Sequence, residues 1–483
     1  MVSGVGNAPL VVGVDSSTQA TKAVVVDVET GEIVAEGRSA HTVSGSGGAR
    51  ESDPRDWWRA LGEALAATGR AERAEAVSVG GQQHGMVTLD ADGEVVRPAT
   101  LWNDVRSAPQ AEALVAARGA DWWAGRVGSV PTAAFTATSW AWLRENEPES
   151  ADRARHVRLP HDYLTSRLIG SRQGVTDRGD ASGTGWWSPA GYDHEVLELI
   201  GLDASALPEV VEPGKAAGEV AAAIAGQGLP LRAGALVASG TGDNMAAAVG
   251  LGLRPGAPVI SLGTSGTAYA VTSRRPADPS GIVAGFADAL GDWLPLACTL
   301  NCTLAVDKVA ALLGRDRQDV EPGGEVVLLP FLDGERTPNL PYASGLLAGL
   351  RHDTTPGQVL QAAYDGAAYA LLAALHDVQG DEGADEPLML IGGGARGRAW
   401  RDTVRRLSGR PVLVPEAQEL VALGAAAQAA ALVTGERADE VARRWGTRRG
   451  VLLDPLPRDE AALERLGAAF ERARPLLDAP LGR

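Results

Sequence analysis

Apolar and polar residues alternate over short segments at the start of the chain, and glycine-rich turns separate these segments. Such a pattern is typical of β-strands joined by tight turns. It predicts strands at residues 10–14, 21–27 and 32–36. A helical region at residues 53–76 follows, and then a strand at residues 76–80.

The same order of strand, turn and strand recurs in the second half of the chain. Residues 257–262 and 268–271 predict strands on either side of the turn Gly263-Thr-Ser-Gly-Thr267. The repeat predicts two similar α/β domains that face each other across a cleft, with a nucleotide between their loops. We place the domains at residues 1–248 and 249–483.

Longer segments with helical spacing and further apolar runs complete the pattern. Helices are predicted at residues 136–145, 160–169, 297–313 and 355–375, and strands at residues 234–238, 326–330, 388–391 and 411–415. Residues 207–234 carry three prolines and are predicted to be a linker. The alanine-rich segment 422–428 predicts a helix that packs tightly on a loop or a ligand.

One carboxylate stands between a glycine turn and an alanine-rich helix. Gly240 and Gly242 flank a sharp turn, and Asp243 and Asn244 follow where a helix begins. Asp243 is either a general base at a strand end or an ordinary helix N-cap. Three glycine or hydroxyl turns elsewhere, at residues 13–18, 261–267 and 391–397, favour phosphoryl transfer with Asp243 as the base.

The composition of the chain limits the classes of molecule that it can bind. The 44 basic and 61 acidic residues give a net charge of −17, which argues against nucleic acid or an anionic membrane as partner. No run of about 20 apolar residues predicts a membrane span. Lysine is scarce, so a phosphate site must rely on backbone N–H groups, a metal ion or arginine.

The two cysteines and the N-terminal residues indicate the cellular compartment of the protein. Cys298 and Cys302 are too few for a disulfide framework, and their spacing places them on one face of a predicted helix as small core residues. Met1–Pro9 is predicted to be a flexible lead-in and not a signal peptide. We therefore expect a cytosolic enzyme.

Two further loops carry candidate ligand-binding side chains. Gln83 and His84 lie in a glycine-flanked loop after a strand, and Trp102, Asn103 and Asp104 combine an apolar ring with polar groups, as suits a polyol. An alternative comes from residues 392–397, whose G-x-G-x-x-G spacing between a strand and a helix is typical of dinucleotide binding. The same turn suits an adenosine site.

In order and spacing these motifs resemble those of the FGGY sugar kinases, of the actin, hexokinase and heat-shock ATPase superfamily. The carrying sequences are Asp15-Ser-Ser-Thr-Gln19, Gly81-Gln-Gln-His-Gly85, Leu101-Trp-Asn-Asp104, Leu159-Pro-His-Asp-Tyr-Leu164, Gly242-Asp-Asn244, Ser261-Leu-Gly-Thr-Ser-Gly-Thr267, Gly334-Glu-Arg-Thr-Pro338 and Leu390-Ile-Gly-Gly-Gly-Ala395. Within the family they most resemble the xylulose kinases.

The resemblance implies two ribonuclease-H-like domains, with the sugar and ATP in the cleft between them. It implies transfer of the γ-phosphoryl group of MgATP to the 5-hydroxyl of D-xylulose, with Asp243 as base and Asp15 and Asp243 holding Mg²⁺ through water. The implied sugar ligands are Gln83, His84, Trp102, Asn103, Asp104 and Asn244, and the implied ATP ligands are Ser17, Thr18, Gly263, Thr264, Gly393, Gly394, Ala395 and Arg398. A homodimer is also expected.

Some features depart from the family pattern or stay outside it. Some xylulose kinases have methionine where this chain has Gln83, and many relatives have glycine where it has Ser17. Glu335 and Arg336 are interpreted as an ion pair for domain closure. Arg178-Gly-Asp180 matches an adhesion tripeptide by chance. A kinase for another polyol, such as ribulose, gluconate or glycerol, and an ATPase switch without sugar turnover are the alternatives.

Overall fold

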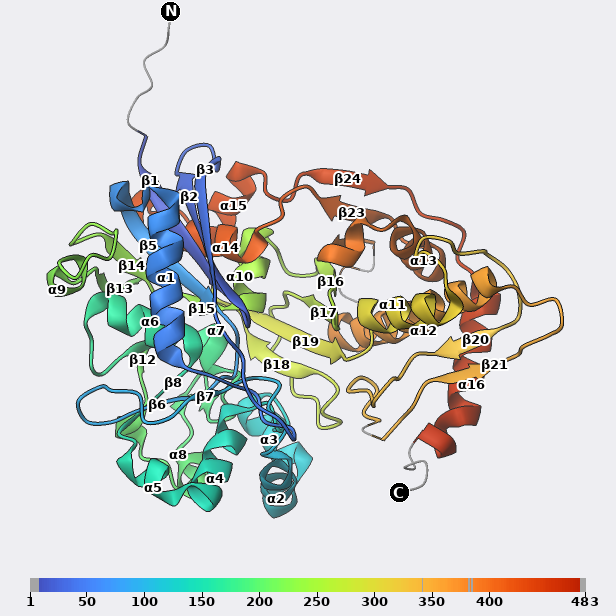
Figure 1. Ribbon diagram of the computed structural model, residues 1–483, viewed down its shortest axis with the longest axis horizontal. Coiled ribbons are helices and arrows are strands. Elements are labelled where there is room, and N and C mark those ends of the chain that lie inside the picture. Colours follow the sequence, from blue (N-terminus) through green and yellow to red (C-terminus); the bar gives the residue numbers. More distant parts are fainter. Residues whose placement is uncertain (1–7, 341, 381–382, 384, 478–483) are drawn as a thin grey trace, which may run out of the picture.

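The computed structural model describes residues 8–340, 342–380, 383 and 385–477, which form two lobes side by side (Figure 1). Most of the predicted lead-in Met1–Pro9 lies outside these residues. Within the described ranges no helix combines the length and the apolar character that crossing a membrane requires.

The first lobe is built on a mixed sheet. β1 (Leu10–Ser16) runs antiparallel to β2 (Ala20–Asp27) and parallel to β5 (Ala74–Gly81). β3 (Ile33–Ala40) extends one edge, and β14 (Leu236–Ala238) with β13 (Ala216–Glu219) extends the other. Every residue of β1 is buried, because elements pack on both faces of the sheet.

The second lobe repeats this arrangement. β16 (Pro258–Leu262) runs antiparallel to β17 (Gly266–Ala270) and parallel to β22 (Leu388–Ile391). β19 (Trp293–Thr299) and β18 (Ala284–Ala287) continue one edge, and β23 (Val412–Pro415) and β24 (Gly450–Leu453) continue the other. The predicted internal repeat is therefore confirmed.

Helix α1 (Pro54–Thr68) covers the first sheet and shows how local signals set its ends. The carboxylate of Asp53 accepts the backbone N–H of Arg55 at 2.9 Å, and Pro54 occupies the first turn. The helix stops before Gly69, whose φ of 60° suits glycine. It is therefore shorter than the predicted helix at residues 53–76.

Further helices and strands complete the two lobes. The first lobe also contains β4 (Glu51–Ser52), β6 (Val87–Leu89), β7 (Ala99–Thr100), α2 (Ala108–Arg118), α3 (Ala120–Val127), α4 (Thr136–Asn146), α5 (Pro148–Arg153), β8 (His156–Arg158), α6 (Pro160–Ile169), β9 (Val175–Asp177), α7 (Arg178–Ala181), β10 (Trp187–Ser188), β11 (Gly191–Tyr192), α8 (His194–Ile200), β12 (Glu209–Val211), α9 (Ala222–Ala225), β15 (Thr241–Gly242) and α10 (Asp243–Gly250). The second contains α11 (Thr303–Leu313), β20 (Val327–Leu329), β21 (Leu346–Ala348), α12 (Pro356–Gln379), α13 (Arg398–Ser408) and α16 (Glu460–Leu477).

Two of the sequence predictions are wrong. The predicted linker at residues 207–234 contains β12, β13 and α9, and β13 is a strand of the first sheet. The predicted helix at residues 297–313 begins only at Thr303, because residues 293–299 form β19. Cys298 therefore lies on a strand and Cys302 in the turn before α11, so the two do not share a helix face.

Two helices near the end of the sequence belong to the first lobe. α14 (Leu420–Thr434) lies against β1, β5 and α10, and α15 (Ala438–Trp445) lies against α14 and α10 (Figure 1). A Cβ atom at Gly13 would lie 1.9 Å from the carbonyl oxygen of Ala422, and one at Gly424 would lie 1.8 Å from that of Ala246. The small residues of α14 thus allow backbone to pack on backbone.

The lobes also touch at the edge strand β18. The backbone N–H of Gly285 donates to Ser129 Oγ at 2.9 Å, and that of Ala287 donates to Ser182 Oγ at 2.8 Å. Ser129 and Ser182 belong to the first lobe, so hydroxyl groups satisfy the free edge of the second sheet.

We expect Gly424→Ala to destabilise the fold by at least about 2 kcal/mol, because the added methyl group collides with backbone atoms. The free energy of unfolding in urea measures the effect. Gly62→Ala, within α1, is the matched control, since its added Cβ atom would lie 3.7 Å from Leu229, an ordinary contact distance. This substitution should leave the free energy of unfolding unchanged or raise it. Equal losses in both variants would contradict this account of α14.

Candidate active site

A cavity of about 280 Å³ lies between the lobes and brings distant segments together. Asp15 reaches it from the end of β1, and Asp243 from the start of α10. The second lobe supplies Gly392 after β22, and the residue before α14, Glu419, completes this part of the wall. The predicted cleft between two domains is thus present, with both predicted acidic residues in it.

Close backbone packing places Asp243. A Cβ atom at Gly240, whose φ is 75°, would lie 2.4 Å from the carbonyl oxygen of Val79. Gly242 occupies the N-cap position, so Asp243 is the first residue of the helix and not the cap. Asp243 Oδ1 accepts the backbone N–H of Asn244 at 2.8 Å and its Nδ2 at 2.9 Å.

Asp15 and Asp243 both have pKa values above the ordinary range of an aspartate. Burial, together with the charges of Asp15 and Asp180, raises the pKa of Asp243 to about 7. Burial also raises the pKa of Asp15, although Ser17 Oγ donates to Asp15 Oδ1 at 2.7 Å. A group that titrates near neutral pH is suited to accept a proton from a substrate hydroxyl.

A lysine that the sequence analysis did not single out lies beside these carboxylates. Lys22 Nζ is 2.7 Å from Glu419 Oε2, and both residues line the cavity. The charge of Lys22 lowers the pKa of Asp15, which opposes the effect of burial. Only the fold brings Lys22 and Glu419 together, since 397 positions separate them.

His84 lies on a strained loop beyond β5. Its φ is 66°, its Nδ1 is 2.7 Å from the carbonyl oxygen of Gly183, and its ring contacts Phe135 and Phe286 at centroid distances of 5.1 and 5.5 Å. Burial lowers the pKa of His84 to about 4. The ring is therefore neutral near pH 7. Its Nδ1–H donates to the carbonyl oxygen of Gly183, and Nε2 can accept a hydrogen bond from a hydroxyl group.

Asn244 links Gln83 to Asp243 by hydrogen bonds. Asn244 Nδ2 donates to Gln83 Oε1 at 2.9 Å as well as to Asp243 Oδ1. The Gln83 side chain is almost fully buried, with 5% exposed. Of the predicted sugar ligands, Asn244 thus bonds directly to Asp243, and Gln83 is linked to Asp243 through Asn244. Their contact with a sugar stays a prediction.

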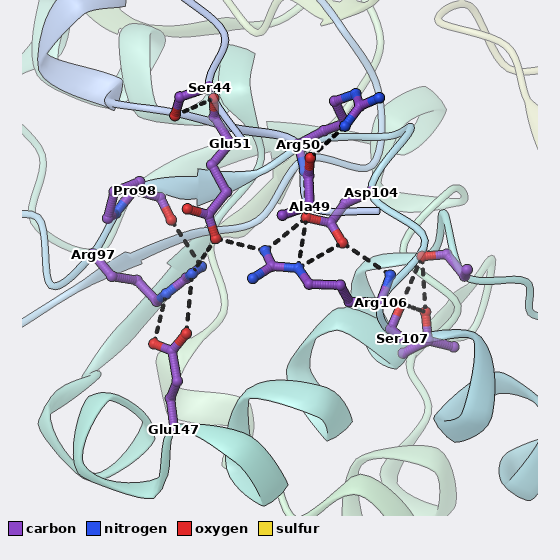
Figure 2. Close-up of polar contacts among 12 residues, drawn as sticks. Ser44, Ala49, Arg50, Glu51, Arg97, Pro98, Asp104, Arg106, Ser107 and Glu147 are labelled. Atoms are coloured by element: carbon purple, nitrogen blue, oxygen red, sulfur yellow. Dashed lines mark hydrogen bonds and ion pairs between the residues drawn. The ribbon is translucent and has the colours of Figure 1, made fainter. Parts of the chain in front are cut away.

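The loop of Trp102, Asn103 and Asp104 is fixed by ion pairs. Asp104 accepts the backbone N–H of Arg50 at 2.9 Å and Nε of Arg106 at 3.0 Å (Figure 2). Arg106 also pairs with Glu51 and stacks 4.3 Å from the centroid of the Trp142 ring. Asp104 therefore anchors the loop, and its direct contact with a sugar stays a prediction.

The other two residues of this loop, Trp102 and Asn103, differ in their contacts. Trp102 Nε1 donates to Thr18 Oγ1 at 3.2 Å, which ties the loop to the first phosphate turn. Asn103 Oδ1 is buried and has no partner among the described residues.

The remaining predicted ATP ligands lie on glycine turns at strand ends. Thr303 Oγ1 donates to the carbonyl oxygen of Gly263 at 2.7 Å, and Thr264 is exposed at the tip of that turn. Gly393, Gly394 and Ala395 form a short 3₁₀ turn after β22. Arg398 is exposed and pairs with Asp402, 3.2 Å away on the next turn of α13.

The chain matches two family models in succession. The FGGY family of carbohydrate kinases, N-terminal domain, covers residues 10–250, and the C-terminal domain of the same family covers residues 259–433. The chain belongs to the FGGY family of carbohydrate kinases.

Relatives with known names extend the match over nearly the whole chain. Xylulose kinases from Streptomyces coelicolor and Streptomyces rubiginosus are 68% and 66% identical to it, over 97% and 98% of this chain and 98% of each relative. The crystal structure of xylulose kinase from Bifidobacterium adolescentis is 36% identical, with a TM-score of 0.83 over 96% of this chain and 99% of that chain.

The FGGY assignment decides between the sequence interpretations. It confirms the expected two-domain fold of the actin and hexokinase type and the expected carbohydrate kinase. The turn at residues 392–397 borders the cavity of an FGGY kinase through Gly392, and the dinucleotide alternative is not favoured.

The cavity suits a divalent cation held largely by water and phosphate. Among the described residues no three His, Cys, Asp or Glu side chains gather as a metal site. The charge of Asp15 nevertheless raises the pKa of Asp243, because two buried carboxylates disfavour ionisation without a cation beside them. Mg²⁺ keeps several waters and takes one or two carboxylates, so the pair fits it.

Behind the site lies a buried charge cluster that the sequence did not reveal. His161 Nδ1 is 2.6 Å from Asp180 Oδ2, and His161 Nε2 is 3.3 Å from Asp162 Oδ1. The neighbouring carboxylates outweigh burial and raise the pKa of His161 to about 9, while burial raises that of Asp180 to about 7. Asp180 is fully buried, which excludes an adhesion role for Arg178-Gly-Asp180.

Glu335 also has a different environment from the one expected. Its carboxylate accepts the backbone N–H groups of Leu300, Asn301 and Arg336, the last at 2.8 Å. Among the described residues no ion pair joins Glu335 to the Arg336 guanidinium. Glu335 instead fixes the turn before α11, so the interpretation as a closure ion pair is wrong.

We expect the free energy of unfolding to fall as the pH rises from about 6.5 to about 9. The folded state raises the pKa of His161 from an ordinary value of about 6.5 to about 9, so its stabilising contribution is fully present below 6.5 and is lost through 9. Urea unfolding across this pH range should show a shallower fall for His161→Gln. Parallel pH profiles for both proteins would contradict the assigned charge cluster.

Proposed function

We propose that this protein transfers the γ-phosphoryl group of ATP to the 5-hydroxyl of D-xylulose. The observation that carries the proposal is a carboxyl group with a pKa of about 7, Asp243, at the first turn of a helix in the cavity between two FGGY lobes. The choice of sugar is supported by relatives of 66–68% identity that are named xylulose kinases.

Asp243 acts as the general base. Ionised above a pH of about 7, it accepts the proton of the sugar hydroxyl as the bond to phosphorus forms. The two hydrogen bonds from Asn244 fix Oδ1, which leaves Oδ2 for the hydroxyl. Phosphoryl transfer needs little further covalent help, so positioning and charge stabilisation supply most of the acceleration.

The ATP side of the cavity consists of backbone donors and few charges. Gly263 and Thr264 with their neighbouring N–H groups hold the β and γ phosphates, and Ser17 and Thr18 border them. Gly393, Gly394, Ala395 and Arg398 form the adenosine end. Asp15 and Asp243 would hold Mg²⁺ through water, and the ion would neutralise phosphate charge.

The sugar side is built around a neutral imidazole. His84 offers Nε2 as an acceptor, Asn103 offers its unpaired Oδ1, and Trp102 offers an indole face to the C–H groups of the sugar. Gln83, Asp104 and Asn244 complete the predicted set. Closure of the lobes excludes water, which would otherwise compete as the phosphoryl acceptor. A cytosolic location and a homodimer complete the proposal.

A sugar panel tests the proposed substrate. With MgATP, we expect ADP release to rise strongly with D-xylulose and to stay near the no-sugar blank with D-ribulose, L-ribulose, glycerol and gluconate. Stimulation by another sugar alone would replace the substrate but keep the kinase chemistry. Absence of stimulation by every sugar would favour an ATPase switch.

Replacement of the base tests the mechanism. We expect Asp243→Ala to lower kcat by about 10²- to 10⁴-fold, since the hydroxyl loses its proton acceptor. Equilibrium binding of ATP should persist, because the phosphate and adenosine turns remain. Near-normal turnover in Asp243→Ala would remove Asp243 as the base.

A further inference from the structure

Two buried polar atoms next to the base lack partners among the described residues. They are Asp180 Oδ1 and Gln83 Nε2. Asp180 is fully buried and Gln83 is 5% exposed. A buried polar atom without a hydrogen bond destabilises the fold, so an acceptor and a donor that both lack partners in one place call for a common explanation.

The two side chains face each other across Gly242. A Cβ atom placed on Gly242 would lie 2.6 Å from Cγ and 2.9 Å from Cδ of Gln83, and 3.2 Å from Asp180 Oδ1. Both groups therefore approach the same point above the residue that precedes Asp243. Glycine at this position leaves the space between carboxylate and amide open.

The direction of the Gln83 amide is set from the other side. Gln83 Oε1 accepts Asn244 Nδ2 at 2.9 Å, and the same nitrogen donates to Asp243 Oδ1. Nε2 is therefore the end of the amide that remains for Asp180. The other oxygen of Asp180, Oδ2, is held by His161 Nδ1 at 2.6 Å.

We propose that Asp180 is a positioning residue for the catalytic base. It acts across Gly242 on the Gln83 amide and through Asn244 on Asp243, and His161 holds it from behind. Asp180 does not touch the substrate. Gln83 thereby has a role besides lining the sugar pocket. Asp180 orients its amide, and the amide in turn orients Asn244 and the base. The proposal rests on the proposed function of Asp243.

The physical consequence is a fixed direction of the Gln83 amide, because the carboxylate of Asp180 faces its N–H end across Gly242 without a hydrogen bond between them. Without an acceptor opposite Nε2, the amide of Gln83 can turn over and present a donor to Asn244 Nδ2. Asp243 Oδ1 then loses one of its two donors. A general base must stay within hydrogen-bond reach of the hydroxyl, and displacement by about 1 Å can cost about 10²-fold in rate.

Reversal of this polarity provides the test. Asp180→Asn keeps an acceptor for His161 but turns a donor toward Gln83 Nε2, and Gln83→Glu places a carboxylate opposite Asp180. The double variant Asp180→Asn with Gln83→Glu restores one donor facing one acceptor and keeps the net charge. Steady-state kcat and the KM values for ATP and D-xylulose are measured for all four proteins.

We expect each single variant to lower kcat about tenfold or more with the KM for ATP unchanged, and the double variant to recover above both singles. Gln361→Glu is the matched control, since Gln361 is buried and donates to Asp365 Oδ1 at 2.7 Å, in α12 and outside the residues that line the cavity. It should leave kcat unchanged.

Three results would overturn the proposal. They are a wild-type kcat in Asp180→Asn, additive losses in the double variant, and an equal loss of kcat in Gln361→Glu, which would attribute the effect to general destabilisation. Failure of the proposed function is separate, because the unmodified protein would then show no turnover of D-xylulose in the same assay.

Discussion

The direct packing of α14 on the first lobe determines where the reacting groups lie. Gly13, two residues before Asp15, meets the backbone of this helix at Ala422, and Gly424 meets the backbone of α10 at Ala246, three residues after Asp243. The face of α14 that lacks bulky side chains therefore determines the positions of Asp15 and Asp243 in the cavity. Interiors are close-packed, so little displacement is available to either.

This packing places like charges together in a site that contains few cations. Asp15, Asp180 and Asp243 all have raised pKa values, and the nearby lysine, Lys22, is already paired with Glu419. The cavity therefore has a deficit of positive charge, which makes ionisation of these carboxylates less favourable.

Much of this could be predicted from the sequence, since short strands, glycine turns and their repetition are local patterns. The hairpin turns of both lobes, Asp243 and the neighbouring strands lie where the pattern indicates. The prediction of a helix through Cys298 is wrong because residues 293–299 carry apolar side chains at spacings compatible with either a helix or a strand. Tertiary contacts favour the strand β19, because it pairs with β17 and β18.

The partners of buried charges could not be predicted in the same way. His161 and Asp180 are 19 positions apart, and Lys22 and Glu419 are 397 apart, so no spacing rule connects them. Glu335 was assigned to its sequence neighbour, whereas its carboxylate bonds to backbone groups of a distant turn. Burial and register created these contacts, and both appear only once the two lobes have formed.

The path of the chain limits how the lobes can move. In the part of the chain that the structure describes, it crosses between lobes three times: from α10 to β16, from β23 to α14, and from α15 to β24. Bodies joined by one linker can swivel freely, but three short connections and the hydrogen bonds at β18 leave few degrees of freedom. The connections and these hydrogen bonds therefore restrict the relative displacement of the two lobes, and with it the displacement of Gly392 in the second lobe relative to Asp243 in the first.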